Sequence, residues 1–195
     1  MKHVNRIVLV CLLFASAAWA QGAPAEVSPV PVQFSASYLY QGSNQTPSGT
    51  NWFSSNGGRA DVSIGEWRHL GAVAEFAGSR TTGLSSVQPM LLTYMAGPRR
   101  SFALGRIKNH RVSAFAQVLV GGVHASDGLF PNGVAIKSSA NAFAFSSGGG
   151  VGVTVNRHLT LRLIQADYLY TQLPNAYNNY QGSFRLGTGI VFRVH

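Results

Sequence analysis

The sequence predicts an all-β fold: an eight-stranded, antiparallel, up-and-down transmembrane β-barrel with a filled polar lumen. Segments of alternating apolar and polar residues recur along the chain. Clusters of Gly, Asn, Ser and Pro separate them, as expected of strands joined by turns. Only 11% of the 195 residues are charged, against about 25% in an average soluble domain. This composition argues against a cytosolic enzyme and favours strands whose outer face contacts lipid.

The first twenty residues predict a secretory signal peptide. Lys2 and Arg6 form a positively charged start, residues 7–15 are an unbroken apolar run, and residues 18–20 (Ala-Trp-Ala) match a cleavage site. The apolar run is too short to cross a membrane as a helix, which takes about 20 residues. We therefore expect export through the inner membrane and removal of the signal.

Three regions follow one another along the chain. Residues 1–20 are the expected signal peptide, residues 21–31 predict an extended N-terminal leader rich in Ala, Pro and Val, and residues 32–195 predict the barrel. The only cysteine, Cys11, lies in the signal peptide, so we expect neither a disulfide nor a cysteine metal site in the exported chain.

The strands are predicted from patterns of period two. In the first strand the apolar face consists of Val32, Phe34, Ala36, Tyr38 and Tyr40. In the last strand Arg185 and Arg193 share one face, so the opposite, apolar face must be buried or in lipid. We expect strands over residues 32–41, 57–66, 70–80, 86–97, 111–125, 142–155, 158–172 and 180–194.

The seventh of these strands breaks its own alternation. Arg162 has even parity, whereas Gln165 and Asp167 have odd parity. A one-residue β-bulge near residues 163–164 would return all three polar side chains to one face, because a bulge inserts an extra residue into a strand. We expect this bulge rather than a charged side chain on the apolar face.

The connections differ in length at the two ends of the predicted barrel. Long polar connections are expected at residues 42–56, 126–141 and 173–179, with a shorter one at 81–85. Short turns are expected at residues 67–69 and 156–157, and a longer basic turn at 98–110. Long loops at one end and short turns at the other are typical of membrane β-barrels, and an even strand number puts both termini on the periplasmic side.

Several segments resemble a known family. They are Gly148-Gly149-Gly150, Asn156-Arg157-His158-Leu159, Arg162, Gln165-Ala166-Asp167-Tyr168 and Gly187-Thr188-Gly189-Ile190-Val191-Phe192. Together they resemble the small outer-membrane β-barrel family, the OmpA-like transmembrane domain in its stand-alone form, over nearly all of residues 32–195. The resemblance implies location in the cell outer membrane. Because the chain stops at the barrel, we expect no anchoring through the peptidoglycan-binding domain of longer family members.

The C-terminal strand resembles the signal read by the barrel-assembly machinery. Gly187, Gly189, Phe192 and Val194 occupy the places of its small and aromatic residues, although Val194 is not aromatic. The resemblance implies that this machinery is a partner during insertion.

The polar face of the strands defines a candidate lumen. An eight-stranded barrel leaves an interior just wide enough for side chains to fill. Buried arginines and acids there should pair, because an unpaired buried charge is costly. An ion-pair plug that closes the barrel is favoured over a gate for small ions. The expected polar network consists of Arg59, Asp61, Glu75, Arg162, Gln165, Asp167, Arg185 and Arg193.

Aromatic and basic residues predict contacts with the membrane surface. Tyrosines at the long-loop end and Trp67 at a short turn would form aromatic girdles. The tyrosines are Tyr38, Tyr40, Tyr168, Tyr170, Tyr177 and Tyr180. A basic cluster at residues 98–111 favours either contact with anionic phospholipid headgroups or a solvated turn, and export argues against nucleic acid. It consists of Arg99, Arg100, Arg106, Lys108 and Arg111.

One pair of residues has a pattern compatible with catalysis. His124 and Ser126 lie on one strand face near the outer rim, and such a His-x-Ser pair is similar to that of the outer-membrane lipid A deacylases. A histidine can activate a serine when an acid orients it, but the neighbouring strand at 142–155 has no acid and Asp127 would point to the other face. The glycines at 148–150 indicate close backbone packing. We therefore expect no catalytic residue, cofactor or metal.

These observations predict a non-enzymatic integral outer-membrane protein, a structural platform that displays polar surface loops. Expected partners are outer-membrane lipids, lipopolysaccharide and an unidentified surface ligand at the loops. The expected state is a monomer that does not bind nucleic acid. The alternatives are a narrow pore for small solutes, a lipid A-modifying enzyme using His124 and Ser126, and a soluble lipocalin-like barrel with Arg162 and Arg185 on its outside.

Overall fold

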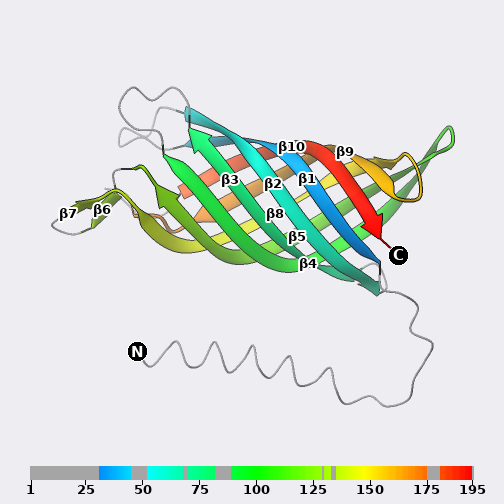
Figure 1. The fold of residues 1–195 in the computed structure, drawn as a ribbon, viewed down its shortest axis with the longest axis horizontal. Coiled ribbons are helices and arrows are strands. Elements are labelled where there is room, and N and C mark those ends of the chain that lie inside the picture. Colours follow the sequence, from blue (N-terminus) through cyan, green and yellow to red (C-terminus); the bar gives the residue numbers. More distant parts are fainter. Residues whose placement is uncertain are drawn as a thin grey trace, which may run out of the picture.

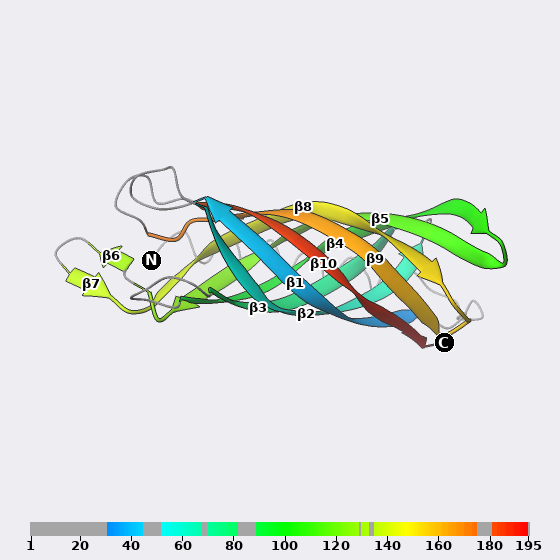
Figure 2. The same cartoon turned by 90° about the horizontal axis from the view of Figure 1, so that it is seen from above.

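Eight long strands close into one antiparallel barrel (Figures 1 and 2). The computed structural model describes residues 31–44, 52–67, 70–81, 89–128, 130–132, 135–174 and 181–194. The barrel strands are β1 (Val32–Asn44), β2 (Trp52–Trp67), β3 (Leu70–Thr81), β4 (Met90–Ile107), β5 (His110–Ser126), β8 (Ala140–Thr154), β9 (Leu159–Thr171) and β10 (Gln181–Val194). The predicted eight-stranded barrel is confirmed, whereas the predicted signal peptide and nearly all of the leader lie outside the described residues.

Closure joins the first and last strands. Around the barrel the order is β1-β10-β9-β8-β5-β4-β3-β2, so each strand is hydrogen-bonded along both edges. Val32 pairs with Val194 and also with Ile64, which ties the two ends of the barrel sheet together. A closed barrel satisfies its backbone groups internally, which is the condition for a strand structure to exist in lipid. Among the described residues, no helix is long and apolar enough to cross a membrane.

The barrel is apolar outside and largely polar inside. Every barrel strand exposes a large apolar side chain: Phe34, Ile64, Phe76, Tyr94, Val120, Phe143, Tyr168 and Phe184. Arg162 and Arg185 are turned inward, with 3% and 0% of their surface exposed. This polarity contradicts the soluble lipocalin-like alternative, which needs both arginines outside, and is typical of a barrel surrounded by lipid.

The predicted β-bulge in β9 is confirmed. Gln165 pairs with Gly187, but Arg162 pairs with Gly189, so the register shifts by one residue across Leu163. The pairing of β9 with β8 shifts at the same place. As a result Leu163 and Ile164 are both exposed, while Arg162 and Gln165 on either side are both buried. The extra residue therefore keeps a single polar face along β9.

The predicted basic turn at residues 98–110 is wrong. β4 continues to Ile107 and β5 begins at His110, so only two residues form the turn. Pro98 lies opposite Ala72 of β3 but is not paired with β5 on its other edge. A proline is tolerated there because it has no backbone N–H to donate. The β4–β5 hairpin projects beyond the barrel at the end where β10 terminates (Figures 1 and 2).

The opposite end carries the longer connections. A small hairpin of β6 (Phe130–Asn132) and β7 (Ala135–Lys137) lies within the predicted loop at 126–141 and stands clear of the barrel (Figure 1). The strands β1 and β2 extend into the predicted loop at 42–56. The tyrosines at positions 177 and 180 lie outside the described residues, as do most of the connections at 81–85 and 173–179.

The lumen also contains an apolar cluster that the sequence analysis did not foresee. It lies on the side formed by β3, β4, β5, β8 and β9, and its members are Val73, Leu91, Met95, Leu119, Val123, Ala125, Ala144, Leu169 and Leu173. Together with the polar residues described below, these side chains fill the interior, as expected for a barrel of eight strands.

Candidate functional site

A ring of connected polar side chains crosses the lumen. Its first segment centres on Asp61 of β2, which accepts contacts from two arginines. Arg99 Nη1 lies 3.0 Å from Asp61 Oδ1, and Arg162 Nη1 lies 2.7 Å from Asp61 Oδ2. One carboxylate therefore joins β2 to β4 and β9.

The ring continues through β9 and returns through β3 and β5. Arg162 Nη1 donates to Gln165 Oε1 at 2.8 Å, and Gln165 Nε2 donates to Asp167 at 3.1–3.2 Å. Arg59 Nη1 lies 2.7 Å from Asp167 Oδ2, and Arg59 Nε lies 3.6 Å from Glu75 Oε2.

The amide of Gln117 closes the ring. Its Nε2 donates to Glu75 Oε2 at 3.3 Å, while its Oε1 accepts from Arg99 Nε and Nη2 at 3.0 and 2.7 Å. The circuit thereby returns to Arg99, where it began.

Three further residues connect the ring to the remaining strands. Arg185 of β10 contacts Glu75 Oε1 at 3.1 Å and Ser146 of β8 at 3.0 Å. Ser35 of β1 donates a hydrogen bond to Asp61. All eight barrel strands therefore contribute at least one side chain to this assembly, which we call the lumen network.

The lumen network combines deep burial with incomplete charge balance. Arg59, Arg185, Asp167 and Glu75 have fully buried side chains, and the other charged members are almost as inaccessible. Four arginines face three acids in these pairs. Buried charges of this kind are tolerated only with close partners, so removing one member leaves its neighbours uncompensated.

Seven of the eight predicted lumen residues lie in the network; the exception is Arg193. That residue is on the inner face of β10 but only half-buried near the strand end, and among the described residues it forms no salt bridge. The network contains Arg99 instead, which was predicted to lie in a turn. Gln117 was not singled out, although its position on the inner face of β5 follows from the alternation.

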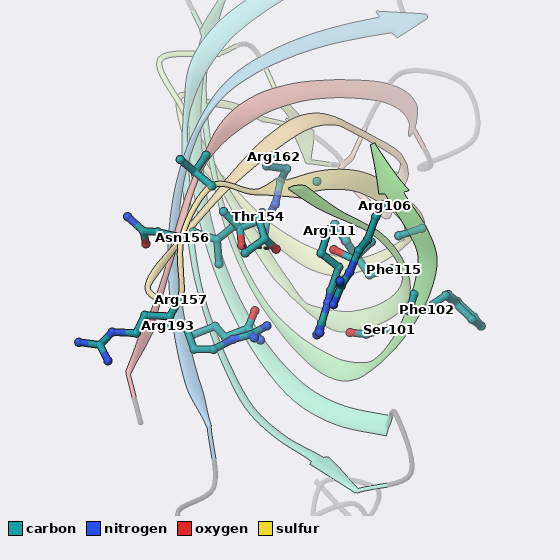
Figure 3. A pocket seen from close by; sticks show the side chains of 18 of the residues that line it. Ser101, Phe102, Arg106, Arg111, Phe115, Thr154, Asn156, Arg157, Arg162 and Arg193 are labelled. Carbon is teal, nitrogen blue, oxygen red and sulfur yellow. Dashed lines mark hydrogen bonds between the residues drawn. The ribbon is translucent and has the colours of Figure 1, made fainter. Parts of the chain in front are cut away.

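A cavity of about 630 Å³ opens at the end of the barrel where β1 begins and β10 ends (Figure 3). We call it the mouth cavity. Arg99, Phe115 and Arg162 line its inner part, whereas the deeper network residues Arg59 and Glu75 are not among its lining. The lumen network therefore separates this cavity from the other half of the lumen.

The candidate catalytic pair lies on the outer face near the opposite end. His124 Nδ1 is 2.7 Å from Asn141 Oδ1, the residue with which it pairs across β5 and β8. Within the described part of the chain, no hydrogen bond joins His124 to Ser126, and no acid contacts this histidine. No group of His, Cys, Asp and Glu side chains in that part could hold a metal ion.

The tyrosines predicted to contact the membrane surface and the residues of the predicted assembly signal can be placed on the barrel. Tyr38, Tyr40 and Tyr168 are exposed on the outer face, and the Tyr38 hydroxyl donates to Asn56 at 2.5 Å. In β10 the glycines at 187 and 189 face inward, whereas Phe192 and Val194 are exposed outside. The burial of the Trp67 side chain lies outside what is described.

Several solved structures are similar to this one. Neisserial surface protein A (NspA) matches with a TM-score of 0.56 and 14% identity, over 86% of this chain and 98% of that one. Ail of Yersinia pestis matches with a TM-score of 0.49 and 16% identity, over 86% and 100%. The outer membrane protein AlkL matches with a TM-score of 0.46 and 13% identity, over 89% and 96%.

These comparisons bear on the fold. No family model matches the sequence, and no curated protein matches it significantly. The likeness to NspA shows that the chain has the fold of a small outer-membrane β-barrel, so the OmpA-like resemblance is confirmed at the level of the fold.

Proposed function

We propose that the protein is a non-enzymatic integral protein of the outer membrane, whose closed barrel is a structural platform for polar surface loops. The observation that carries this proposal is the lumen network, in which side chains from all eight strands meet. A network that ties every strand to the centre stabilises a closed barrel and leaves little free cross-section for solute.

The outer surface supports the location in a membrane. Each strand exposes large apolar side chains, while the charges of the central strand segments are inside. In water this arrangement would expose a continuous apolar surface, whereas in lipid it removes that surface from water. Outer-membrane lipids and lipopolysaccharide are therefore the proposed partners of this surface, and the barrel-assembly machinery is the proposed partner during insertion.

The membrane location is tested by fractionation combined with gel mobility. We expect the protein to sediment with outer membranes and to migrate differently in SDS gels before and after boiling, because a closed barrel remains folded in the unheated detergent. A soluble periplasmic protein whose mobility does not change on heating would contradict the proposal.

The closed platform is distinguished from a narrow pore by planar-bilayer recordings. We expect no discrete conductance steps across many independent insertions of the folded protein, because the lumen is filled at the level of Asp61, Glu75 and Arg185. Reproducible single-channel steps from the wild-type protein would favour the pore instead. The heat-dependent gel mobility of the same preparation verifies that the protein is folded.

A further inference from the structure

The mouth cavity is strongly basic. Its lining includes six arginines, and none of its described lining residues is an acid. The arginines are Arg99, Arg106, Arg111, Arg157, Arg162 and Arg193. They come from β4, β5, β9, β10 and the β8–β9 turn, so the fold gathers them from distant parts of the sequence.

A second β-bulge turns Arg106 into this cavity. Ala103 pairs with Ser113, but Gly105 pairs with Val112, so Leu104 is an extra residue in β4. Gly105 has a φ of 138°, a conformation that favours glycine. If β4 continued as a regular strand through Leu104, Arg106 would face away from the lumen. Because the bulge accommodates the extra residue, Arg106 lies directly opposite Arg111.

The arrangement of Arg106 and Arg111 favours a bound anion between them. Like charges directly opposite each other on neighbouring strands are destabilising. Figure 3 shows the two side chains side by side, extending in the same direction from the hairpin. Arg111 also pairs across β5 and β8 with Thr154, whose Oγ1 lies 3.2 Å from Thr160 Oγ1. Guanidinium and hydroxyl donors therefore line one wall.

Two fixed arginines form the floor of the cavity and carry more positive charge than their acid partner neutralises. Arg99 and Arg162 share the single carboxylate of Asp61. Their Cζ atoms lie 4.7 and 5.1 Å from the ring centroid of Phe115, which supports both guanidinium planes. The floor thus offers preorganised donors at low solvent exposure, where an anion is bound more strongly than in water.

We propose that the mouth cavity is a binding site for phosphate-type oxyanions. Arginine is suited to such groups because its donors form a fork that matches phosphate oxygens. The volume of about 630 Å³ lies within the range of small-molecule sites, roughly 300–1,000 Å³. The phosphate can belong to an anionic phospholipid headgroup or to a soluble phosphorylated compound. The proposal does not depend on whether the lumen conducts.

The test titrates inorganic pyrophosphate into the folded protein in uncharged detergent micelles, followed by calorimetry. Arg106→Gln/Arg111→Gln removes the facing pair. Arg100→Gln/Lys108→Gln is the matched control, since it removes two charges from the same hairpin but neither residue lines the cavity. We expect binding by the wild type and the control, and a Kd raised at least about tenfold in the cavity variant.

A parallel arm distinguishes the source of the phosphate. Native mass spectrometry compares the same proteins in micelles containing phosphatidylglycerol or phosphatidylcholine. If the wild type retains phosphatidylglycerol but not phosphatidylcholine, the cavity variant retains neither, and pyrophosphate does not bind, the site takes a lipid headgroup. If pyrophosphate binds, the site takes a soluble ligand. Absence of both interactions, or equal loss in the cavity variant and the control, would overturn the proposal.

A second variant, which changes the direction of Arg106 and not the number of charges, tests the proposal if the charge variant fails to fold. Deletion of Leu104 and Gly105 together keeps every arginine but makes Arg106 follow Ala103 directly, which turns it to the face away from Arg111. Deletion of Leu104 alone removes only the extra residue, keeps Arg106 opposite Arg111, and is the control. We expect the double deletion to bind more weakly than the wild type, with heat-dependent gel mobility retained as evidence of a folded barrel. Unchanged binding in the folded double deletion would contradict the assigned geometry.

Discussion

Asp61 is the residue on which the lumen network depends most. It accepts from Arg99, Arg162 and Ser35, and so connects four strands through one carboxylate. Replacement of Asp61 by a neutral residue leaves Arg99 and Arg162 buried, and neither forms another salt bridge within the described part of the chain. The network is therefore most vulnerable at this position.

Asp61→Asn is expected to lower the free energy of unfolding in micelles by about 3–5 kcal/mol, the range for breaking a buried ion pair by removal of one partner. The measurement is denaturant unfolding followed by tryptophan fluorescence. Asp127→Asn is the matched control, because Asp127 is exposed and has a φ of 54°, which asparagine also adopts. Equal stability of the two variants would contradict the role assigned to Asp61.

A second residue-scale prediction concerns Gly148. A Cβ atom at this position would lie against the carbonyl oxygen of Ala166 and 2.6 Å from Cα of Asp167. The prediction from sequence of close backbone packing in this glycine run is thus confirmed. Strand β8 can approach β9 here only because residue 148 has no side chain.

Gly148→Ala is expected to destabilise the barrel by about 1–3 kcal/mol, as overpacking does, because Asp167 and its ion pair with Arg59 must shift. Gly58→Ala is the control: the nearest atom to its Cβ would be Ser37 O at 4.0 Å. Denaturation midpoints in the same detergent compare the two. A larger loss in the Gly58 variant would refute the packing argument.

At the scale of the element, β-bulges decide which face a charged side chain occupies. The bulge at Leu163 keeps Arg162 on the face of Gln165 and Asp167. The bulge at Leu104 brings Arg106 to the face of Arg111. In both strands one extra residue reverses the parity of everything beyond it.

Deletion of both Leu163 and Ile164 is therefore expected to prevent folding to the heat-sensitive barrel form, because Arg162 and Gln165 would become consecutive residues on opposite faces. Deletion of Leu163 alone removes only the extra residue, leaves Arg162 and Gln165 on one face, and serves as the control. The folded fraction is read from unheated SDS gels after refolding into micelles. Normal folding of the double deletion, or equal failure of both variants, would contradict this argument from strand parity.

At the scale of the whole molecule, the two ends of the barrel differ in chemistry. The end where β1 begins and β10 ends holds the arginine-rich mouth cavity, and the other end carries the β6–β7 hairpin and the pair His124 and Ser126. The lumen network and the apolar cluster lie between them. A non-enzymatic platform predicts no covalent change to the surrounding lipids.

Lipid A from a Gram-negative host expressing the wild type, Ser126→Ala or an empty vector is expected to be identical by mass spectrometry. His124 contacts Asn141 rather than an acid in the described structure, so its pairing lacks the charged partner of a serine hydrolase triad. Loss of an acyl chain with the wild type but not with Ser126→Ala would instead identify a deacylase.

Alternation was sufficient to predict the inward and outward faces of the barrel strands. It placed Arg59, Asp61, Glu75 and Arg185 inside, and its failure in β9 located the bulge. Each of these features depends on the two-residue period of a single strand, which is a local property of the sequence.

Only the tertiary structure decided how deep each charged side chain lies in the lumen and which residues it contacts. Arg99, followed by basic residues and preceded by Pro98, had the composition of a turn, but pairing with Gln117 and Asp61 places it in the lumen. Arg193 shares the inner face of β10 yet lies near its end. Period two reveals a side chain's face but not its depth, because depth is set by the register of strands that are far apart in sequence and meet only when the barrel closes.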